Sequence, residues 1–195
     1  MRLARRLLPL ALVLAAAPWQ PVAAQRQQQP TVIILVRHAE KDTSDPGARD
    51  PLLTEAGERR ARELARAIRR RNVNAIITTQ LRRTVLTGKP AADSFRITPD
   101  VFQAVADGRQ TRMGMAQMVR ERYMGKTVLI VGHSNTVPAT IEALGGPRIK
   151  DICDTSHSNL FMLVLYPNRS PRFTHTHYGA ADPPGGEACS NGLVK

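Results

Sequence analysis

Two arginines and two histidines have the types and positions needed for phosphate chemistry. Arg37 and His38 directly follow one apolar stretch, His133 closely follows another, and Arg83 lies shortly after a third. Guanidinium groups bind phosphate oxygens through fixed pairs of N–H donors and a positive charge. A neutral imidazole has a lone pair that can attack phosphorus, and nearby arginines disfavour its protonation. We therefore expect these four residues to form a phosphate site in which His38 is the nucleophile.

The apolar pattern predicts the elements that position these side chains. Strands are predicted at 31–36, 74–78, 127–131, 160–166 and 172–178, with a short edge strand near Ile97. A first helix is predicted from the cap Thr54 to about Arg71. A second is predicted from Gln80, after a cap at Thr79, to about Lys89, where Pro90 ends or kinks it. Two more helices are predicted over 112–124 and after Asn135 up to Gly145. Strands that alternate with helices predict a single-domain α/β fold with a mostly parallel central sheet and helices on both faces. Such sheets bind ligands at the carboxyl ends of their strands, where the four residues lie.

Three ordered motifs resemble the histidine phosphatase superfamily, in its phosphoglycerate-mutase-like, short single-domain branch. They are Val36-Arg37-His38-Ala39-Glu40 with Asp50-Pro51-Leu52-Leu53-Thr54-Glu55-Ala56-Gly57 downstream, Thr79-Gln80-Leu81-Arg82-Arg83-Thr84-Val85-Leu86-Thr87, and Val131-Gly132-His133-Ser134-Asn135-Thr136. The similarity covers roughly residues 31–178. Three motifs in the right order and context are more specific than any one of them.

The resemblance implies a role for each of the four residues. His38 becomes a phosphohistidine, and Arg37, Arg83 and His133 hold the phosphate. No metal or organic cofactor is implied. The sequence departs from the family at Ala39, where Gly is common; we expect the extra methyl group to be tolerated if the backbone angles there are ordinary.

The general acid that protonates the leaving group is not marked by a motif. Larger relatives place a carboxyl group downstream of the second motif, and Asp107 occupies about that region here. Glu40 is our second candidate because it lies two residues from His38, and Asp100 is the third. The alternative for Asp107 is an ordinary turn residue before Gly108.

The N-terminal 24 residues are typical of a secretory signal peptide. Three arginines precede an apolar run that is too short to span a bilayer, and small residues at 22–24 offer a cleavage site. An uncleaved anchor is the alternative, which Pro9 and Pro18 disfavour. We divide the remainder into a linker at 25–30, a histidine phosphatase-like domain at 31–180 and a tail at 181–195. Export to the periplasm or the medium favours a disulfide between Cys153 and Cys189.

The chain is basic, with 28 Lys and Arg against 16 Asp and Glu and a formal charge of +12. Removal of the leader with its three arginines leaves +9. Much of the excess lies on the helix predicted after Thr54, whose arginines we interpret as a solvated face: Arg59, Arg60, Arg62, Arg66, Arg69, Arg70 and Arg71. Because aromatic stacking platforms and nucleic-acid motifs are lacking, we expect no nucleic-acid partner; binding through this helix would predict a steep salt dependence.

The remaining histidines have ordinary interpretations. His175 and His177 would share one face of a strand and could bind a metal, but a third ligand is not evident. We expect His157 on the surface or in a loop rather than in catalysis. Lys41 and Asn135 either line a substrate entrance or solvate a loop.

These observations favour an exported phosphatase that hydrolyses a phosphomonoester through a phosphohistidine. A large insertion between the first and third motifs is lacking, so we expect an open site, with a small phosphorylated substrate such as an envelope sugar phosphate. A phosphoglycerate-mutase-type phosphotransferase is the nearest alternative, but it must exclude water. A non-catalytic binder of phosphorylated glycan or anionic polymer is the alternative from another class. The oligomeric state stays open.

Overall fold

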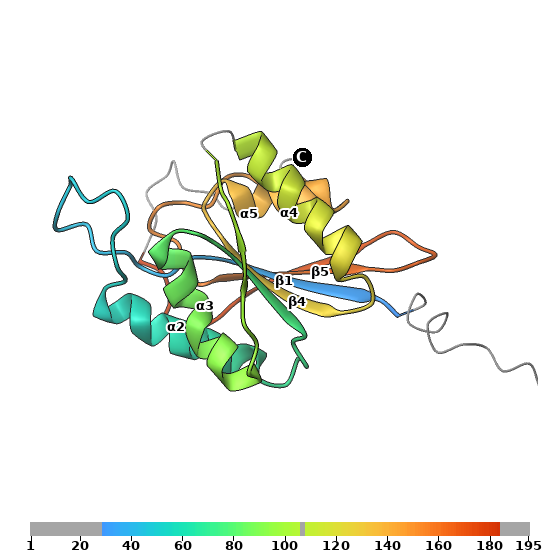
Figure 1. The fold of residues 1–195 in the computed structure, drawn as a ribbon, viewed down its shortest axis with the longest axis horizontal. Coiled ribbons are helices and arrows are strands. Elements are labelled where there is room, and N and C mark those ends of the chain that lie inside the picture. Colours follow the sequence, from blue (N-terminus) through green and yellow to red (C-terminus); the bar gives the residue numbers. More distant parts are fainter. Residues whose placement is uncertain (1–28, 106–107, 184–195) are drawn as a thin grey trace, which may run out of the picture.

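A six-stranded sheet organises the chain (Figure 1). The computed structural model describes residues 29–105 and 108–183. Its strands are β1 (Thr31–Arg37), β2 (Ala75–Thr79), β3 (Asp100–Phe102), β4 (Thr127–Gly132), β5 (Asn159–Leu165) and β6 (Arg172–His177), in the spatial order β3-β2-β4-β1-β5-β6. Strands β1 to β4 pair in parallel, and β5 runs antiparallel to both of its neighbours. The predicted mostly parallel sheet is confirmed, and the edge strand lies three residues beyond Ile97.

Four helices cover the two faces of the sheet. Helices α2 (Glu55–Ile68) and α3 (Arg82–Phe95) pack on one face, and α4 (Gly108–Arg122) and α5 (Thr136–Ala143) pack on the other (Figure 1). The part of the chain that the structure describes holds no helix long and apolar enough to cross a bilayer. The predicted leader and most of the predicted tail lie outside the described residues.

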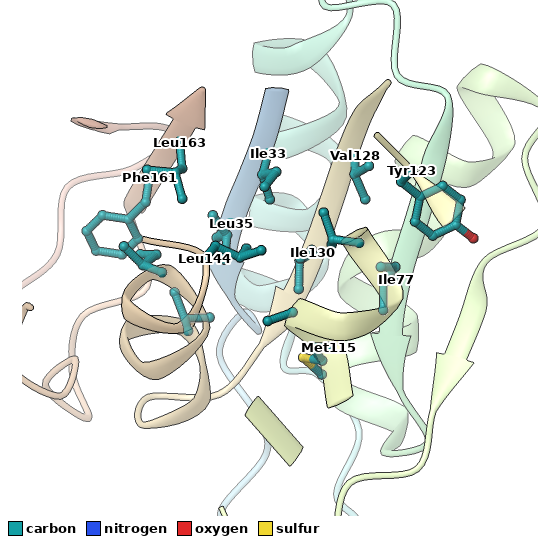
Figure 2. Packing of buried hydrophobic residues seen from close by; sticks show 14 of the residues in the cluster. Ile33, Leu35, Ile77, Met115, Tyr123, Val128, Ile130, Leu144, Phe161 and Leu163 are labelled. Carbon is teal, nitrogen blue, oxygen red and sulfur yellow. The ribbon is translucent and has the colours of Figure 1, made fainter. Parts of the chain in front are cut away.

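Strand β1 is apolar throughout because both of its faces are covered. Ile33 and Leu35 point into the cluster beneath α4 and α5, which Figure 2 shows with its partners from β2, β4 and β5. Ile34 and Val36 point to the opposite cluster, against α2 and α3. All four side chains are at most 1% exposed. Burial on both faces is the reason that the strand has a continuous apolar run instead of an alternating one.

Helix α2 begins where the sequence predicts. Thr54 caps it, and its hydroxyl accepts a hydrogen bond from the Gly57 N–H at 3.1 Å. Gly57 is required because a Cβ atom there would lie 2.3 Å from the carbonyl oxygen of Glu40. This close approach fixes the first turn of α2 against the segment that follows β1.

Helix α3 continues past Pro90, whereas the sequence predicted an end near Lys89, with Pro90 ending or kinking the helix. It continues to Phe95, and Arg96 ends it with a left-handed φ of 55°. A proline inside a helix costs about 3 kcal/mol because it cannot donate a backbone hydrogen bond. The next two residues, Ala91 and Ala92, are buried in the cluster that α3 shares with the sheet. Packing of this last turn offsets the lost hydrogen bond.

Candidate active site

The ends of β1 and β4 bring His38 and His133 together. Arg37, the last residue of β1, pairs with Gly132, the last residue of β4. The His38 N–H donates to the Gly132 carbonyl at 2.9 Å, and the centroids of the two imidazole rings lie 5.5 Å apart. The two histidines therefore lie at the carboxyl edge of the sheet, as the topology requires.

His38 is held as a neutral imidazole with one free lone pair. Its Nδ1 lies 2.8 Å from the Ala39 carbonyl oxygen. A carbonyl only accepts hydrogen bonds, so Nδ1 carries the proton and Nε2 has the lone pair. Burial, assisted by the positive charge of Arg37 and Arg83, lowers the pKa of His38 to about 2, although its bond to Ala39 acts in the opposite direction. The ring is therefore neutral at physiological pH.

Arg37 is buried and almost fully engaged. Its side chain is 5% exposed and pairs with Asp154 at 3.0 Å. Nη1 donates to the carbonyl oxygens of Cys153 and Ser156. Its Nε, however, is buried and has no hydrogen-bond partner among the described residues.

Arg83 presents a second unpaired donor. Its Nη1 lies 3.7 Å from Asp50 Oδ1, whereas its buried Nε is likewise without a partner in the described part of the chain. A buried N–H that lacks an acceptor costs about 1–3 kcal/mol. Phosphate oxygens would satisfy such donors, so two guanidinium groups beside His38 fit a phosphoryl ligand.

His133 is oriented by the second motif. Its Nε2 lies 3.1 Å from the hydroxyl of Thr79, which in turn lies 2.8 Å from the hydroxyl of Thr84. Burial, followed by the charges of Arg83 and Arg37, lowers the pKa of His133 to about 4. His133 is therefore also neutral near pH 7.

Thr79 is not the cap of α3 that the sequence suggested. It is the last residue of β2, and Leu81 occupies the cap position without a side-chain bond. The carboxylate of Asp50 instead accepts from the Arg82 N–H, at 3.0 and 3.1 Å. An anion at a helix N-terminus satisfies its free N–H groups. Thr79 is thereby left to hold His133.

Thr87 ties α3 to the segment after His38. Its hydroxyl accepts from the Ala39 N–H at 2.9 Å and donates to the Arg83 carbonyl at 2.7 Å. The methyl group of Ala39 is fully buried beside Leu53 and Ala61, so the departure from Gly is accommodated. The last Thr of the second motif thus fixes the backbone beside His38.

Glu40 is poorly suited to donate a proton. Its carboxylate forms an ion pair with Arg60 at 2.8 Å. Burial alone would raise the pKa of Glu40, but the hydrogen bonds and the charge of Arg60 outweigh it and lower the pKa below its ordinary value. Glu40 is therefore ionised at neutral pH, and this geometry weighs against our second candidate.

Arg60 does not belong to the solvated face assigned to its helix. It is 4% exposed, and besides Glu40 it donates to the carbonyl oxygens of Tyr178 and Ala180 and lies 3.9 Å from Asp182. The signal in the sequence is helical spacing: the buried residues of α2 are Gly57, Arg60, Ala61, Leu64, Ala65 and Ile68. Arg60 falls on this inner face.

His157 lies in a loop, one of the two predicted places, but it is buried against His38 instead of exposed on the surface. It is 8% exposed, and its Nδ1–H donates to the carbonyl oxygen of His38 at 2.9 Å. The centroid of its ring lies 6.0 Å from that of His38. Asp182 holds the backbone N–H groups of His157 and Ser158, at 2.7 and 2.9 Å. No local pattern marks this contact, because the two histidines are 119 positions apart.

The other two candidates for the general acid, and the predicted disulfide, lie away from His38 or outside the described residues. Asp107 lies outside the described residues. Asp100, in β3, accepts a hydrogen bond from the Tyr123 hydroxyl on the α4 side of the sheet. Cys153 is disulfide-bonded, and Cys189, its predicted partner, lies outside the described residues.

His175 and His177 lie side by side on β6. Their ring centroids are 4.9 Å apart, and they contact Asn159 and the hydroxyl of Ser158 respectively. Within residues 29–105 and 108–183, no group of three or more potential metal ligands is formed. Lys41 and Asn135 are both exposed, and neither side chain has a described hydrogen bond.

Comparison with known proteins points to one family. The model of the histidine phosphatase superfamily (branch 1) matches residues 33–107. The sequence matches none of the curated proteins.

Several solved structures share the fold. Mycobacterial hydrolase 1 is 15% identical, with a TM-score of 0.59, over 78% of this chain and all of its own. The mycobacterial glucosyl-3-phosphoglycerate phosphatase Rv2419c with inorganic phosphate is 16% identical, with a TM-score of 0.57, over 77% of this chain and 97% of its own. The proposed phosphohistidine phosphatase SixA from Agrobacterium tumefaciens is 23% identical, with a TM-score of 0.54, over 78% and 99%.

Proposed function

We propose that this chain is a member of the histidine phosphatase superfamily, and that it is a phosphatase that hydrolyses a phosphomonoester through a phosphohistidine on His38. One observation carries the proposal. The Nδ1–H of His38 donates to the Ala39 carbonyl, so the Nε2 lone pair is free, and the two arginines whose charges act on His38, Arg37 and Arg83, each have a buried Nε without a partner among the described residues. This arrangement supplies a nucleophile and positive charge to the same phosphoryl group.

The reaction has two displacement steps. In the first, the lone pair of His38 Nε2 forms a bond to phosphorus, and the bond to the ester oxygen breaks with its electron pair. An acid supplies the proton that this oxygen needs as it leaves as an alcohol. In the second, water attacks phosphorus, the P–N bond breaks, and the same group accepts a proton from the water. Arg37, Arg83 and His133 hold the three non-bridging oxygens throughout.

We propose Asp107 as the acid of the first step. Three carboxylates of the described site are each paired with an arginine: Glu40 with Arg60, Asp50 with Arg83 and Asp154 with Arg37. Such pairing favours the ionised form, which cannot donate a proton. Asp107→Asn should lower kcat strongly for a substrate with a poor leaving group and much less for p-nitrophenyl phosphate, whose leaving group needs no proton.

We further propose hydrolysis rather than phosphotransfer, in the periplasm or the medium. A mutase must keep water from the phosphohistidine, whereas the chain inserts no covering domain between its first and third motifs. A small phosphorylated molecule of the envelope, such as a sugar phosphate, is the proposed substrate class.

Phosphate release from a panel of phosphomonoesters tests the proposal. The chain from Gln25 and its His38→Ala variant are compared, with chelator present in both assays. Turnover that resists chelator and vanishes in the variant is expected, and acid-labile, base-stable phosphate on the wild-type chain identifies the phosphohistidine. Equal turnover in both chains would refute the assignment of His38. Binding of phosphorylated ligand without turnover, unchanged in the variant, would indicate the non-catalytic binder.

A further inference from the structure

The edge of the sheet opposite the active site is crowded with exposed basic residues. The strands β1, β2 and β4 begin there, since Val32 lies opposite Thr127 and Ala75 lies opposite Val128. Helices α2, α3 and α4 end on this side of the sheet. The turn between β5 and β6 lies on this side too, at the right-hand end of Figure 1. The exposed basic residues of this edge, which we call the basic edge, are Arg69, Arg70, Arg71, Arg96, Arg122, Lys126, Arg169 and Arg172.

The side chains of the basic edge are not neutralised within the described structure. None of the eight forms an ion pair there, whereas the arginines at the other end of α2, Arg59 and Arg62, pair with glutamates. The neighbouring acids are engaged locally: Asp93 pairs with Lys89, and Glu121 accepts from Gln117. Positive charge therefore accumulates on one side of the molecule.

Helix dipoles explain only part of this charge. Arginines at the C-termini of α2, α3 and α4 complement the partial negative charge of the helix ends. Lys126, Arg169 and Arg172, however, belong to loops or strands and not to helices. Lys126 lies over the ring of Tyr123, and Arg169 lies 3.5 Å from the centroid of Tyr166.

An apolar side chain projects from the middle of the basic edge. Met124 is 50% exposed and stands between Arg122 and Lys126. Beside it lies a hollow of about 390 Å³ lined by Gln29, Asn74, Met124, Gly125 and Lys126. Basic side chains around an exposed apolar one suit the headgroup region of a bilayer, where charge and apolar surface meet.

We propose that the basic edge docks on the surface of an anionic phospholipid bilayer. Charge complementarity supports this partner, since several Lys and Arg on one surface are attracted to anionic headgroups. The described chain begins at Gln29, which lines the hollow beside Met124 and Lys126.

Docking in this way orients the enzyme. His38 and His133 lie at the carboxyl ends of β1 and β4, opposite the basic edge. The active site then faces away from the membrane and receives its substrate from the aqueous side. The proposal does not depend on the phosphatase assignment, since it concerns other residues.

Vesicle sedimentation tests the proposal. The chain from Gln25, which retains every strand and helix described here, and the full chain are each mixed with phosphatidylcholine vesicles with or without phosphatidylglycerol. Binding is expected only to the anionic vesicles for the shortened chain, and it should weaken as salt is added. Since each basic residue near such a surface contributes about fivefold, Arg71→Gln with Lys126→Gln should weaken binding about 25-fold. A second pair, Arg169→Gln with Arg172→Gln, should act similarly.

The matched control removes the same charge at the opposite side. Lys41→Gln with Arg49→Gln, in the loop after β1, should leave vesicle binding unchanged. Equal loss in the control pair, or equal binding to neutral and anionic vesicles, would overturn the proposal. Release by inorganic phosphate at constant ionic strength would instead indicate a site for free phosphate. Tighter binding to duplex DNA than to vesicles would also contradict a membrane partner. Thermal melting of each variant confirms that it is folded.

Discussion

Replacing Arg60 by Met should destabilise the protein far more than replacing its neighbour Arg59. Both arginines lie on α2 and pair with a glutamate, at 2.8 Å for Arg60 and 3.3 Å for Arg59. They differ in burial, since the side chain of Arg60 is 5% exposed and that of Arg59 is 59% exposed. The two variants therefore compare a buried and an exposed ion pair on one helix.

The expected loss of unfolding free energy follows from the carboxylate of Glu40, which loses its ion-pair partner when Arg60 is replaced. Removal of one partner from a buried pair costs about 3–5 kcal/mol. The side chain of Glu40 is 26% exposed, so the pair is only partly buried and we expect the lower end, about 3 kcal/mol. An exposed pair at i,i+4, such as that of Arg59, contributes about 0.4 kcal/mol.

Urea unfolding measures this difference. With a slope of about 2 kcal/mol per molar urea, the midpoint should fall by about 1.5 M for Arg60→Met and by about 0.2 M for Arg59→Met. The pKa values of Glu40 and Asp182 are both lowered in the folded state, to which the charge of Arg60 contributes. Their contribution to stability is present above the ordinary carboxyl pKa and is lost as the pH falls through the folded values. The difference between wild type and Arg60→Met should therefore shrink in acid. Equal midpoint shifts for the two variants at neutral pH would refute this reasoning.

Three further predictions concern the site. Gly57→Ala should destabilise the protein by more than about 1 kcal/mol and lower kcat, because the new Cβ would displace the Glu40 backbone. A thermal melt and an activity assay measure the two effects, and an unchanged melting temperature would contradict the prediction. His157→Ala should lower kcat about tenfold with little change in KM, because it removes the hydrogen bond to the His38 carbonyl. His157→Asn retains an N–H donor and should restore much of the loss. Equal rates in the two variants would contradict a positioning role for His157. The pKa of His38 is lowered to about 2 and that of His133 to about 4, so protonation of these rings should not reduce kcat/KM between pH 7 and pH 5. A decline in kcat/KM centred near pH 6.5 would show that His38 titrates normally.

Local patterns were sufficient for the elements that carry the motifs. Strands β1 and β4 were predicted to within one residue of their ends, because continuous apolar runs indicate strands that are buried on both faces. Thr54 caps α2 as predicted. Parallel neighbouring strands end at the same edge of a sheet, so the proximity of His38 and His133, which follow β1 and β4, could be predicted.

Packing overrode local propensity in α3. A proline normally ends a helix, yet the burial of Ala91 and Ala92 carries α3 past Pro90 to Phe95. The same limitation applies to Thr79, whose hydroxyl serves His133 because Asp50, 32 positions from Arg82, caps the helix instead. A local pattern does not contain a partner so distant along the chain.

The α/β architecture, the sheet edge that holds the candidate site and the residue types gathered there could be predicted, because apolar periodicity and motif spacing are properties of neighbouring residues. The contacts of Arg60, Glu40 and His157 could not be predicted in this way, because they depend on tertiary packing. Charged and polar side chains are ordinarily solvated, and they become buried and paired here through contacts that span 20 positions for Glu40 with Arg60 and 119 for His38 with His157. Burial also sets the protonation of His38, because removal of water disfavours the imidazolium form.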